Sequence, residues 1–394
     1  MNTPKIRFKG FKDDWEQRKL GELGKATGGT SIESEFSAEG VYKVISIGSY
    51  SENSVYNDQG IRAIKSDKTN NRVLNRNDLT MILNDKTTSG NIIGRVLLIE
   101  ESGIYVYNQR TERIEINVEE YDPVFLYEML NAPNIREKII KQSQGNTQIY
   151  VNWSAISLLD YMIPSKEEQV KIGEYLHNIS HLITLHQRKC DETKQLKKFM
   201  LQKMFPKNGE KNPEIRFEGF TDDWEQRKVQ GVADRFDNLR IPVAANLRVH
   251  GTTPYYGANG IQDYVEGFTH DGEFVLVAED GANDLKNYPV KCVNGRIWVN
   301  NHAHVLQGKA GIADNSFLAF AISQSDIESL LVGGGRAKLN AETLMSIEFR
   351  LPCLQEQYRI GEYLTQLNHL ITLHQRKCEK LKELKKFMLQ NMFV

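Results

Sequence analysis

Two long stretches of the chain carry apolar residues at alternating spacings of three and four. The first follows Pro164 and the second follows Pro352. This spacing places apolar side chains along one face of a helix and is typical of helices that pair in a coiled coil. The positions expected in the seam are Ile172, Leu176, Ile179 and Ile183 in the first stretch and Ile360, Leu364, Leu367 and Ile371 in the second.

Both stretches have the features of long helices. Each opens with an acidic turn, KEEQ or LQEQ, and neither is interrupted by proline. Acidic residues favour a helix N-terminus. A helix from about Lys166 to Met204 would be roughly 58 Å long at about 1.5 Å per residue. Because neither helix can bury its apolar face alone, we expect the two to form an antiparallel pair.

The ends of the two halves of the chain are nearly duplicated. PKIRFKGFKDDWEQRKL begins at Pro4 and PEIRFEGFTDDWEQRKV at Pro213, while HLITLHQRKC occurs at His181 and again at His369. The bodies between these ends share only scattered resemblance, such as IYVYNQ with IWVNNH. Drift after a gene duplication should erode frames and bodies alike. We therefore interpret the chain as one duplicated frame that holds two different recognition bodies.

Each body has the pattern of a β-rich domain. Short apolar runs are separated by Gly, Asn and Asp clusters, and one apolar helix follows, PVFLYEMLNA or NSFLAFAISQ. The predicted fold class is α+β, with two mixed, β-rich globular domains joined by two long helices in an antiparallel coiled coil and a pseudo-two-fold internal repeat. The predicted segments are 1–163 for the first lead-in and body, 164–212 for the central helix and linker, 213–351 for the second lead-in and body, and 352–394 for the C-terminal helix.

Several loops of the bodies have side chains that suit nucleic acid. Amides can pair bidentately with adenine, and hydroxyls and cations contact phosphate oxygens. Each loop taken alone could equally be an ordinary turn. The stretch TTPYYGANGIQDY from Thr252 is expected as one such loop. The candidate DNA-contacting residues are Thr30, Ser31, Lys86, Thr87, Thr88, Asn146, Gln148, Thr253, Tyr255, Tyr256, Asn259, Asn283, His302, Arg336 and Lys338.

Composition and missing motifs point away from catalysis. The net charge is −1, so any DNA-binding surface must be local. The chain has no NPPY or DPPY tetrapeptide, no GxGxxG or GxxxxGK[ST] loop and no nuclease pattern, so we expect no catalytic residue. The pair His302 and His304 lacks a suitably spaced third ligand, and we expect no metal. His186 and His374 fit polar seam positions better than metal sites.

Cysteine usage and hydropathy indicate the compartment. The chain has four cysteines and no CxxC pair, so we expect reduced thiols. Its first residues form no apolar segment, and no run is apolar enough to cross a bilayer. We expect a cytoplasmic protein without membrane contact.

The chain resembles the specificity (S) subunits of type I restriction–modification systems, the HsdS family. RIPVAANLRVHGTTPYYGANGIQDYV, GEFVLVAEDGAN and WVNNHAHVL of the second body carry the resemblance, together with the paired IGEYL helices. The first body matches chiefly through TGGTS, which lacks the proline often found after GGT, and through its loop before the helix.

The resemblance implies a non-catalytic subunit with two target recognition domains, each reading one half of a bipartite site in double-stranded DNA. It also implies two methyltransferase (M) subunits, which methylate adenine N6 with S-adenosylmethionine, and restriction (R) subunits that use ATP and Mg. The chain itself is expected to bind no cofactor. Half-sites that face one side of the duplex lie about 10 bp apart. The alternatives are a specificity chain for another effector and a scaffold or regulator that reads no sequence.

Overall fold

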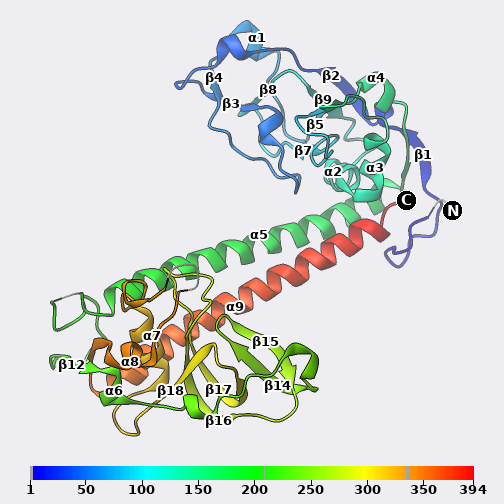
Figure 1. The fold of residues 1–394 in the computed structure, drawn as a ribbon. Coiled ribbons are helices and arrows are strands. Elements are labelled where there is room, and N and C mark those ends of the chain that lie inside the picture. The colour runs from blue at the N-terminus through cyan, green and yellow to red at the C-terminus, as the bar shows by residue number, and fades with distance from the viewer. Residues whose placement is uncertain (1–2, 208, 334–336) are drawn as a thin grey trace. The chain divides into compact units, whose positions relative to one another are not determined.

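The computed structural model describes residues 3–207, 209–333 and 337–394, and it divides into two compact units. Unit 1 consists of Met1–His186 and Arg376–Val394, and unit 2 consists of Gln187–Gln375. The two long helices, α5 (Lys166–Lys203) and α9 (Leu354–Asn391), each contribute to both units (Figure 1). Division by contacts thus differs from the sequence-based segments, because it splits both helices.

The predicted long helices are confirmed. Each has 38 residues and carries acidic side chains in its first turn. The Cys378 thiol faces the carbonyl of Ile183 in unit 1, and the Cys190 thiol faces the carbonyl of Ile371 in unit 2, both at 3.9 Å. Residue numbers rise along α5 as they fall along α9 between these two contacts, so the helices run antiparallel.

The apolar faces of the helices serve the bodies as well as each other. Ile172 and Leu176 lie in the unit 1 core, together with Phe393 at the end of α9. In unit 2, Ile360 and Leu364 lie in a core with Phe205, just beyond α5. The other seam positions are Ile179 and Leu367, which are buried, and Ile183 and Ile371, which are half-buried.

The body of unit 1 is built from short sheets. A four-stranded sheet has the order β2-β9-β5-β7, and a three-stranded sheet has the order β4-β3-β8. Two strand pairs, β1-β11 and β10-β6, complete it. The strands are β1 (Glu16–Lys19), β2 (Gly24–Gly28), β3 (Tyr42–Ile45), β4 (Arg62–Ala63), β5 (Leu79–Ile82), β6 (Asn84–Asp85), β7 (Val96–Leu98), β8 (Tyr105–Tyr107), β9 (Thr111–Ile116), β10 (Ile149–Tyr150) and β11 (Asp160–Ile163). The helices are α1 (Asp67–Asn70), α2 (Pro123–Asn131), α3 (Pro133–Ile140) and α4 (Trp153–Ile156).

The body of unit 2 has one six-stranded sheet of order β13-β18-β16-β17-β14-β15. The pair β12-β19 matches β1-β11 of unit 1. The strands are β12 (Glu225–Lys228), β13 (Ala233–Arg235), β14 (His250–Gly257), β15 (Gly260–Val265), β16 (His270–Ala278), β17 (Val290–Val299), β18 (Ala303–Gly308) and β19 (Glu348–Leu351). The helices are α6 (Val229–Val232), α7 (Asn315–Ser323) and α8 (Ala341–Ser346).

The two bodies share a strand order, although their sequences show only scattered resemblance. The order β2-β9-β5-β7 corresponds to β13-β18-β16-β17. The end of β17 pairs in parallel with β14, just as β8 pairs in parallel with β3. One continuous strand in unit 2 is therefore divided in unit 1 into β7 and β8.

The duplicated frame forms the same contacts in both units. The guanidinium of Arg7 donates to both carboxylate oxygens of Glu168, at 2.7 and 2.8 Å, and Arg216 donates to Glu356 at the same two distances. Both carboxylates are fully buried. The side chain of Asp122 caps α2 in unit 1, and Asp314 caps α7 in unit 2. The start of each long helix is thus fastened to its own body.

The predicted strands of both bodies and the apolar helices α2 and α7 are confirmed. The expectation of a loop at TTPYYGANGIQDY is wrong, since these residues form the β14–β15 hairpin. Tyr255 and Tyr256 are both buried, and the pairing of β14 with β15 shifts register between them. Both residues also pair with β17, an inner strand of the six-stranded sheet.

Candidate nucleic-acid interface

In unit 1, loops from four parts of the body meet beyond the end of β5. The backbone N–H of Ile32 donates to Asn108 Oδ1 at 3.1 Å, which ties the loop after β2 to the β8–β9 turn. The N–H of Leu83 donates to the carbonyl of Arg110 in that turn. Asn84 pairs with Tyr150 across β6 and β10. The loops that carry the candidate residues are therefore neighbours.

The loop after β6 is held by the carboxylate of Asp85. Thr87 donates to Asp85 Oδ1 from its N–H and from its hydroxyl, both at 2.9 Å. Burial alone would raise the pKa of Asp85, but the N–H groups of Ile92 and Thr87 hold it below its usual value. A charged anchor of this kind presents the exposed Lys86, Thr87 and Thr88 on a defined turn.

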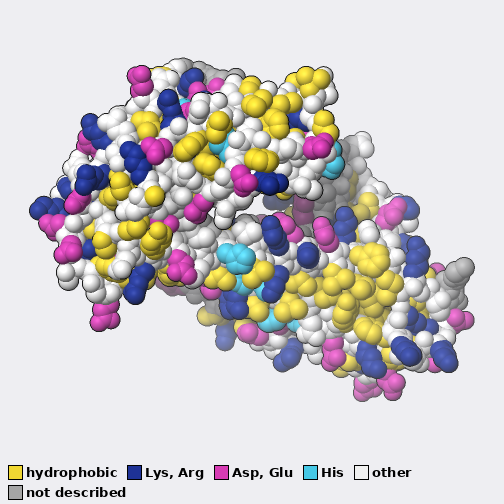
Figure 2. All heavy atoms as spheres, turned by 90° about the horizontal axis from the view of Figure 1, so that it is seen from below, with side chains coloured by type: hydrophobic (Ala, Val, Ile, Leu, Met, Phe, Trp, Pro, Cys, Tyr) yellow, Lys and Arg dark blue, Asp and Glu magenta, His cyan; other side chains and the backbone are white. Residues whose placement is uncertain are grey.

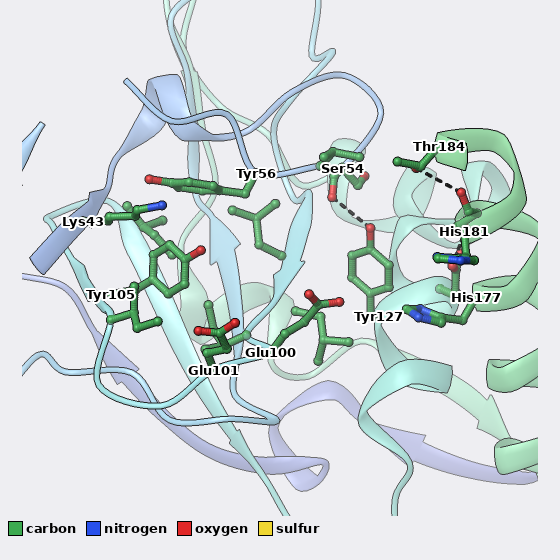
Figure 3. A pocket seen from close by; sticks show the side chains of 18 residues that line it. Lys43, Ser54, Tyr56, Glu100, Glu101, Tyr105, Tyr127, His177, His181 and Thr184 are labelled. Atoms are coloured by element: carbon green, nitrogen blue, oxygen red, sulfur yellow. Dashed lines mark hydrogen bonds between the residues drawn. The ribbon is translucent and has the colours of Figure 1, made fainter. Parts of the chain in front are cut away.

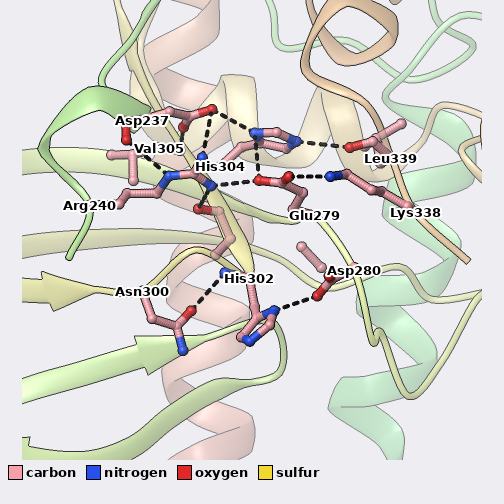
Figure 4. Close-up of polar contacts among 12 residues, drawn as sticks. Asp237, Arg240, Glu279, Asp280, Asn300, His302, His304, Val305, Lys338 and Leu339 are labelled. Atoms are coloured by element: carbon pink, nitrogen blue, oxygen red, sulfur yellow. Dashed lines mark hydrogen bonds and ion pairs between the residues drawn. The ribbon is translucent and has the colours of Figure 1, made fainter. Parts of the chain in front are cut away.

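Unit 2 gathers loops at the corresponding end of β16. Asn259, in the β14–β15 turn, donates to the carbonyl of Gly281 at 2.9 Å and accepts from the N–H of Asn283 at 3.0 Å. His302 Nδ1 lies 2.5 Å from Asp280 Oδ1 (Figure 4). Asp280 also forms a β-bridge with Lys338. Four of the candidates in unit 2 are thus brought together.

Beneath these loops lies a charge network around the buried His304 (Figure 4). His304 Nδ1 is 2.7 Å from Asp237, and Glu279 accepts from Arg240 at 2.6 Å and contacts Lys338 at 2.9 Å. Burial would raise the pKa values of Asp237 and Glu279, but hydrogen bonds from His304, Arg240 and Lys338 hold both low.

Asp237, Glu279 and His304 are the one described group whose ligand atoms could hold a metal ion. Arg240 and Lys338 already neutralise the Glu279 carboxylate. We therefore treat the group as a structural network that supports the loops. It sets the position of Lys338 because an ion pair ties that side chain to the end of the sheet.

The candidate residues differ in exposure. Tyr255 is 1 % exposed, and its hydroxyl bonds the backbone of Val243, so we leave it and the buried Tyr256 out of the interface. Arg336 lies outside the described residues. The half-buried candidates are Thr253, His302 and Lys338, and the exposed ones are Thr30, Ser31, Lys86, Thr87, Thr88, Asn146, Gln148, Asn259 and Asn283.

Sequence reasoning missed Asn84, Arg110 and Asp280, which lie among these loops. Arg110 is exposed in the β8–β9 turn, and Asn84 and Asp280 follow the equivalent strands β5 and β16. The signal that could have found them is the weak echo of IYVYNQ in IWVNNH. Those stretches lead into equivalent turns, 108–110 and 300–302.

The surface suits local rather than global electrostatic binding. On the face drawn in Figure 2, lysine and arginine side chains are interspersed with aspartate and glutamate. This mixture agrees with the net charge of −1. Across the described residues, no helix combines the length and the apolar character that crossing a membrane requires.

Unit 1 also contains a pocket of about 500 Å³ between its body and residues 177–184 of α5 (Figure 3). Tyr56, Tyr105 and Tyr127 line it, and His177 and His181 face it from α5. Glu100 and Glu101, which follow β7, also line it. Leu98 of β7 pairs with Leu79, the first residue of β5. The pocket thus lies toward the opposite end of β5 from the candidate interface.

Comparison with known proteins decides the family. The model described as "Type I restriction modification DNA specificity domain" matches residues 12–195 and 221–383. The chain belongs to the type I restriction–modification specificity subunit family. DNA target recognition is the role of this family, whose members are generally non-catalytic.

Relatives and a solved structure agree with this assignment. A putative specificity subunit of Haemophilus influenzae is 43% identical over 42% of each chain, so that alignment spans less than half of the relative. The MjaVIII specificity subunit of Methanocaldococcus jannaschii is 21% identical over 95% of this chain and 91% of its own. A crystal structure of the S subunit from M. genitalium matches 100% of this chain and 99% of its own, with a TM-score of 0.74 and 15% identity. That likeness confirms the fold.

Proposed function

We propose that this chain is the DNA-reading subunit of a type I restriction–modification complex. Each unit would read one half of a bipartite site in double-stranded DNA. The observation that supports this proposal is that each body gathers polar loops at the equivalent end of its own sheet, and the two sheets share one strand order. Two different sets of side chains on one backbone plan suit two different half-sites.

The long helices would set the distance between the two half-sites. Two readers on one face of the duplex need centres about one helical turn apart, roughly 10 bp. The nearly duplicated frame would offer two similar docking surfaces to two M subunits, and R subunits would join them. In this proposal the partners supply the chemistry, with S-adenosylmethionine for adenine N6 methylation and ATP and Mg for restriction, and the complex works in the cytoplasm.

The test is detection of N6-methyladenine by long-read sequencing in a methylation-free host. The host expresses this chain alone, its partner methyltransferase alone, and both together. We expect a split motif to be methylated only when both are expressed. Marks produced by this chain alone would overturn the non-catalytic role, and a continuous motif would mean that only one unit reads DNA.

A further inference from the structure

Five positions around the candidate interface are equivalent in the two units, although their side chains differ. The backbone N–H of Leu83 donates to the carbonyl of Arg110, and the backbone N–H of Glu279 donates to the carbonyl of His302, both at 2.9 Å. The next residue along each strand is Asn84 or Asp280. The same backbone pattern therefore aligns Arg110 with His302 and Asn84 with Asp280.

The rest of the pattern agrees with this alignment. The N–H of Val151 donates to the backbone carbonyl of Leu83 at 2.9 Å, and the N–H of Leu339 donates to the backbone carbonyl of Glu279 at 2.7 Å. Tyr150 then pairs with Asn84, as Lys338 pairs with Asp280.

In both units the aligned side chains also contact each other. His302 Nδ1 lies 2.5 Å from Asp280 Oδ1. In unit 1 the amide of Asn84, oriented so that both of its polar atoms are satisfied, accepts from Arg110 Nη1 at 2.6 Å. A donor in the turn is thus held by an acceptor at the end of the central strand in each unit. The chemistry of the pair is retained while its residues have changed.

The backbone of Arg110 adds an independent observation. Its φ is 69°, and among the described residues only Ser54 and Asn77 are other non-glycine residues with positive φ. Asparagine tolerates this region, but arginine pays a steric cost there. Residues held in such conformations gather at binding sites, where the conformation aims the side chain.

We propose that Arg110 and His302 are the specificity-determining residues of the two units, each positioned by its acceptor, Asn84 or Asp280. The inference rests on the proposed function and deepens it. A guanidinium has five N–H donors, and Asn84 takes one of them. Its fork matches O6 and N7 of guanine, so Arg110 reads a guanine in the major groove. His302 reads a base pair of the other half-site.

The decisive variant is Arg110→Gly in the complex with the partner methyltransferase. Glycine accepts the positive φ, so the melting temperature of the Arg110→Gly variant should be no lower than that of the wild type. We expect methylation of the original motif to fall by about tenfold to a hundredfold. The motif should become degenerate at one guanine of one half-site, while the other half-site stays unchanged.

Further variants separate reading from general binding. Arg110→Lys keeps the charge without the planar fork, so it should keep only part of the guanine preference, whereas Arg110→Gly should lose it. His302→Ala should relax only the opposite half-site. Matched controls are Arg76→Ala and Arg296→Ala, which remove exposed arginines elsewhere in unit 1 and unit 2 and should leave the motif intact.

The outcomes distinguish this inference from the proposed function. If the wild-type complex yields no split motif, the proposed function fails. If the wild type yields one and Arg110→Gly methylates it unchanged, or relaxes both half-sites together, the specificity role of Arg110 is overturned. Arg110→Asn serves as a second variant because asparagine also tolerates positive φ.

Discussion

Unit 1 and unit 2 are nearly identical in the duplicated frame and differ in the side chains of the candidate interface. The contact between Arg7 and Glu168 is repeated at matching distances by Arg216 and Glu356. The bodies keep one strand order, yet β17 of unit 2 corresponds to the two short strands β7 and β8 of unit 1. The two bodies thus share their backbone hydrogen-bonding pattern, while the side chains at equivalent positions differ.

This difference has a physical reason. A strand order depends on backbone pairing and on burial of alternate side chains, which many sequences satisfy. A frame that locks two helices into two bodies depends on buried ion pairs and close backbone approach. Few residues can replace those, so the frames stay nearly identical while the bodies diverge.

The largest test of the comparison removes the aromatic side chain that follows each long helix. Phe205 lies 5.5 Å from Phe317, and Phe393 lies 5.7 Å from Phe125, measured between ring centroids. Truncation of a buried phenylalanine should lower the free energy of unfolding by about 3–4 kcal/mol. We expect Phe205→Ala to reduce hydrogen-exchange protection in α7, and Phe393→Ala to reduce it in α2.

The controls for this test are the equivalent exposed residues Phe199 and Phe387, which are 48% and 52% exposed. Their alanine variants should change stability by about 0.5 kcal/mol or less. Equal loss of protection in both units from a single core variant would contradict the division into two units.

A second test asks whether the frames are energetically equal. Glu168→Ala and Glu356→Ala each leave a largely buried arginine without its carboxylate partner. Each should lower the free energy of unfolding by about 3 kcal/mol, measured by urea denaturation. Glu167→Ala, which removes an exposed acid from the same turn, should have little effect. Costs that differ by more than about 1 kcal/mol would show that the two frames are not equivalent.

A third test uses a position where the bodies differ in charge. Glu112 of β9 is 5 % exposed, and burial raises its pKa from 4.5 to about 7. Folded protein therefore holds a proton between pH 4.5 and 7 that unfolded protein releases, so stability falls as pH rises through this window. Above it, Glu112→Gln should raise the free energy of unfolding by about 2 kcal/mol.

The measurement for Glu112 is urea denaturation at pH 5 and at pH 8. The gain from Glu112→Gln should appear at pH 8 and largely vanish at pH 5. In unit 2 the equivalent position carries His304 beside Asp237, so no such gain is expected from removing an acid there. A gain that is equal at both pH values would rule out titration of Glu112 as its cause.

The smallest test concerns the close approach of each long helix to its body. A Cβ added to Gly173 would lie 2.7 Å from Asp122 Oδ1, and one added to Gly361 would lie 2.7 Å from Asp314 Oδ1. Gly173→Ala and Gly361→Ala should each cost about 1–2 kcal/mol in thermal unfolding. Gly231→Ala is the control, since its added Cβ would meet no atom within 4 Å apart from its chain neighbours and the backbone of its own helix. No cost at either site would mean that the long helix can shift away from Asp122 or Asp314, the capping residues of α2 and α7.

The sequence predicted which kinds of residue line the candidate interface, but not every residue that lies there. Candidates such as Lys86 and Asn259 could be selected from local sequence because polar loops are recognisable there, and both residues are exposed in the structure. Tyr255 was misplaced, because the hairpin that buries it depends on pairing with β17. Arg110 was overlooked, since only the weak echo of IYVYNQ in IWVNNH marks its turn, and its contact with Asn84 joins distant parts of the chain.

What the sequence determined by itself is the duplicated frame, the two long helices and the strands of each body. These follow from local periodicity and from repeated segments, which one chain displays openly. Only the tertiary structure decided that β17 corresponds to β7 and β8, and that Arg110 meets Asn84 as His302 meets Asp280. Such pairings are made by backbone hydrogen bonds between distant segments, and those bonds leave no mark in the residues that form them.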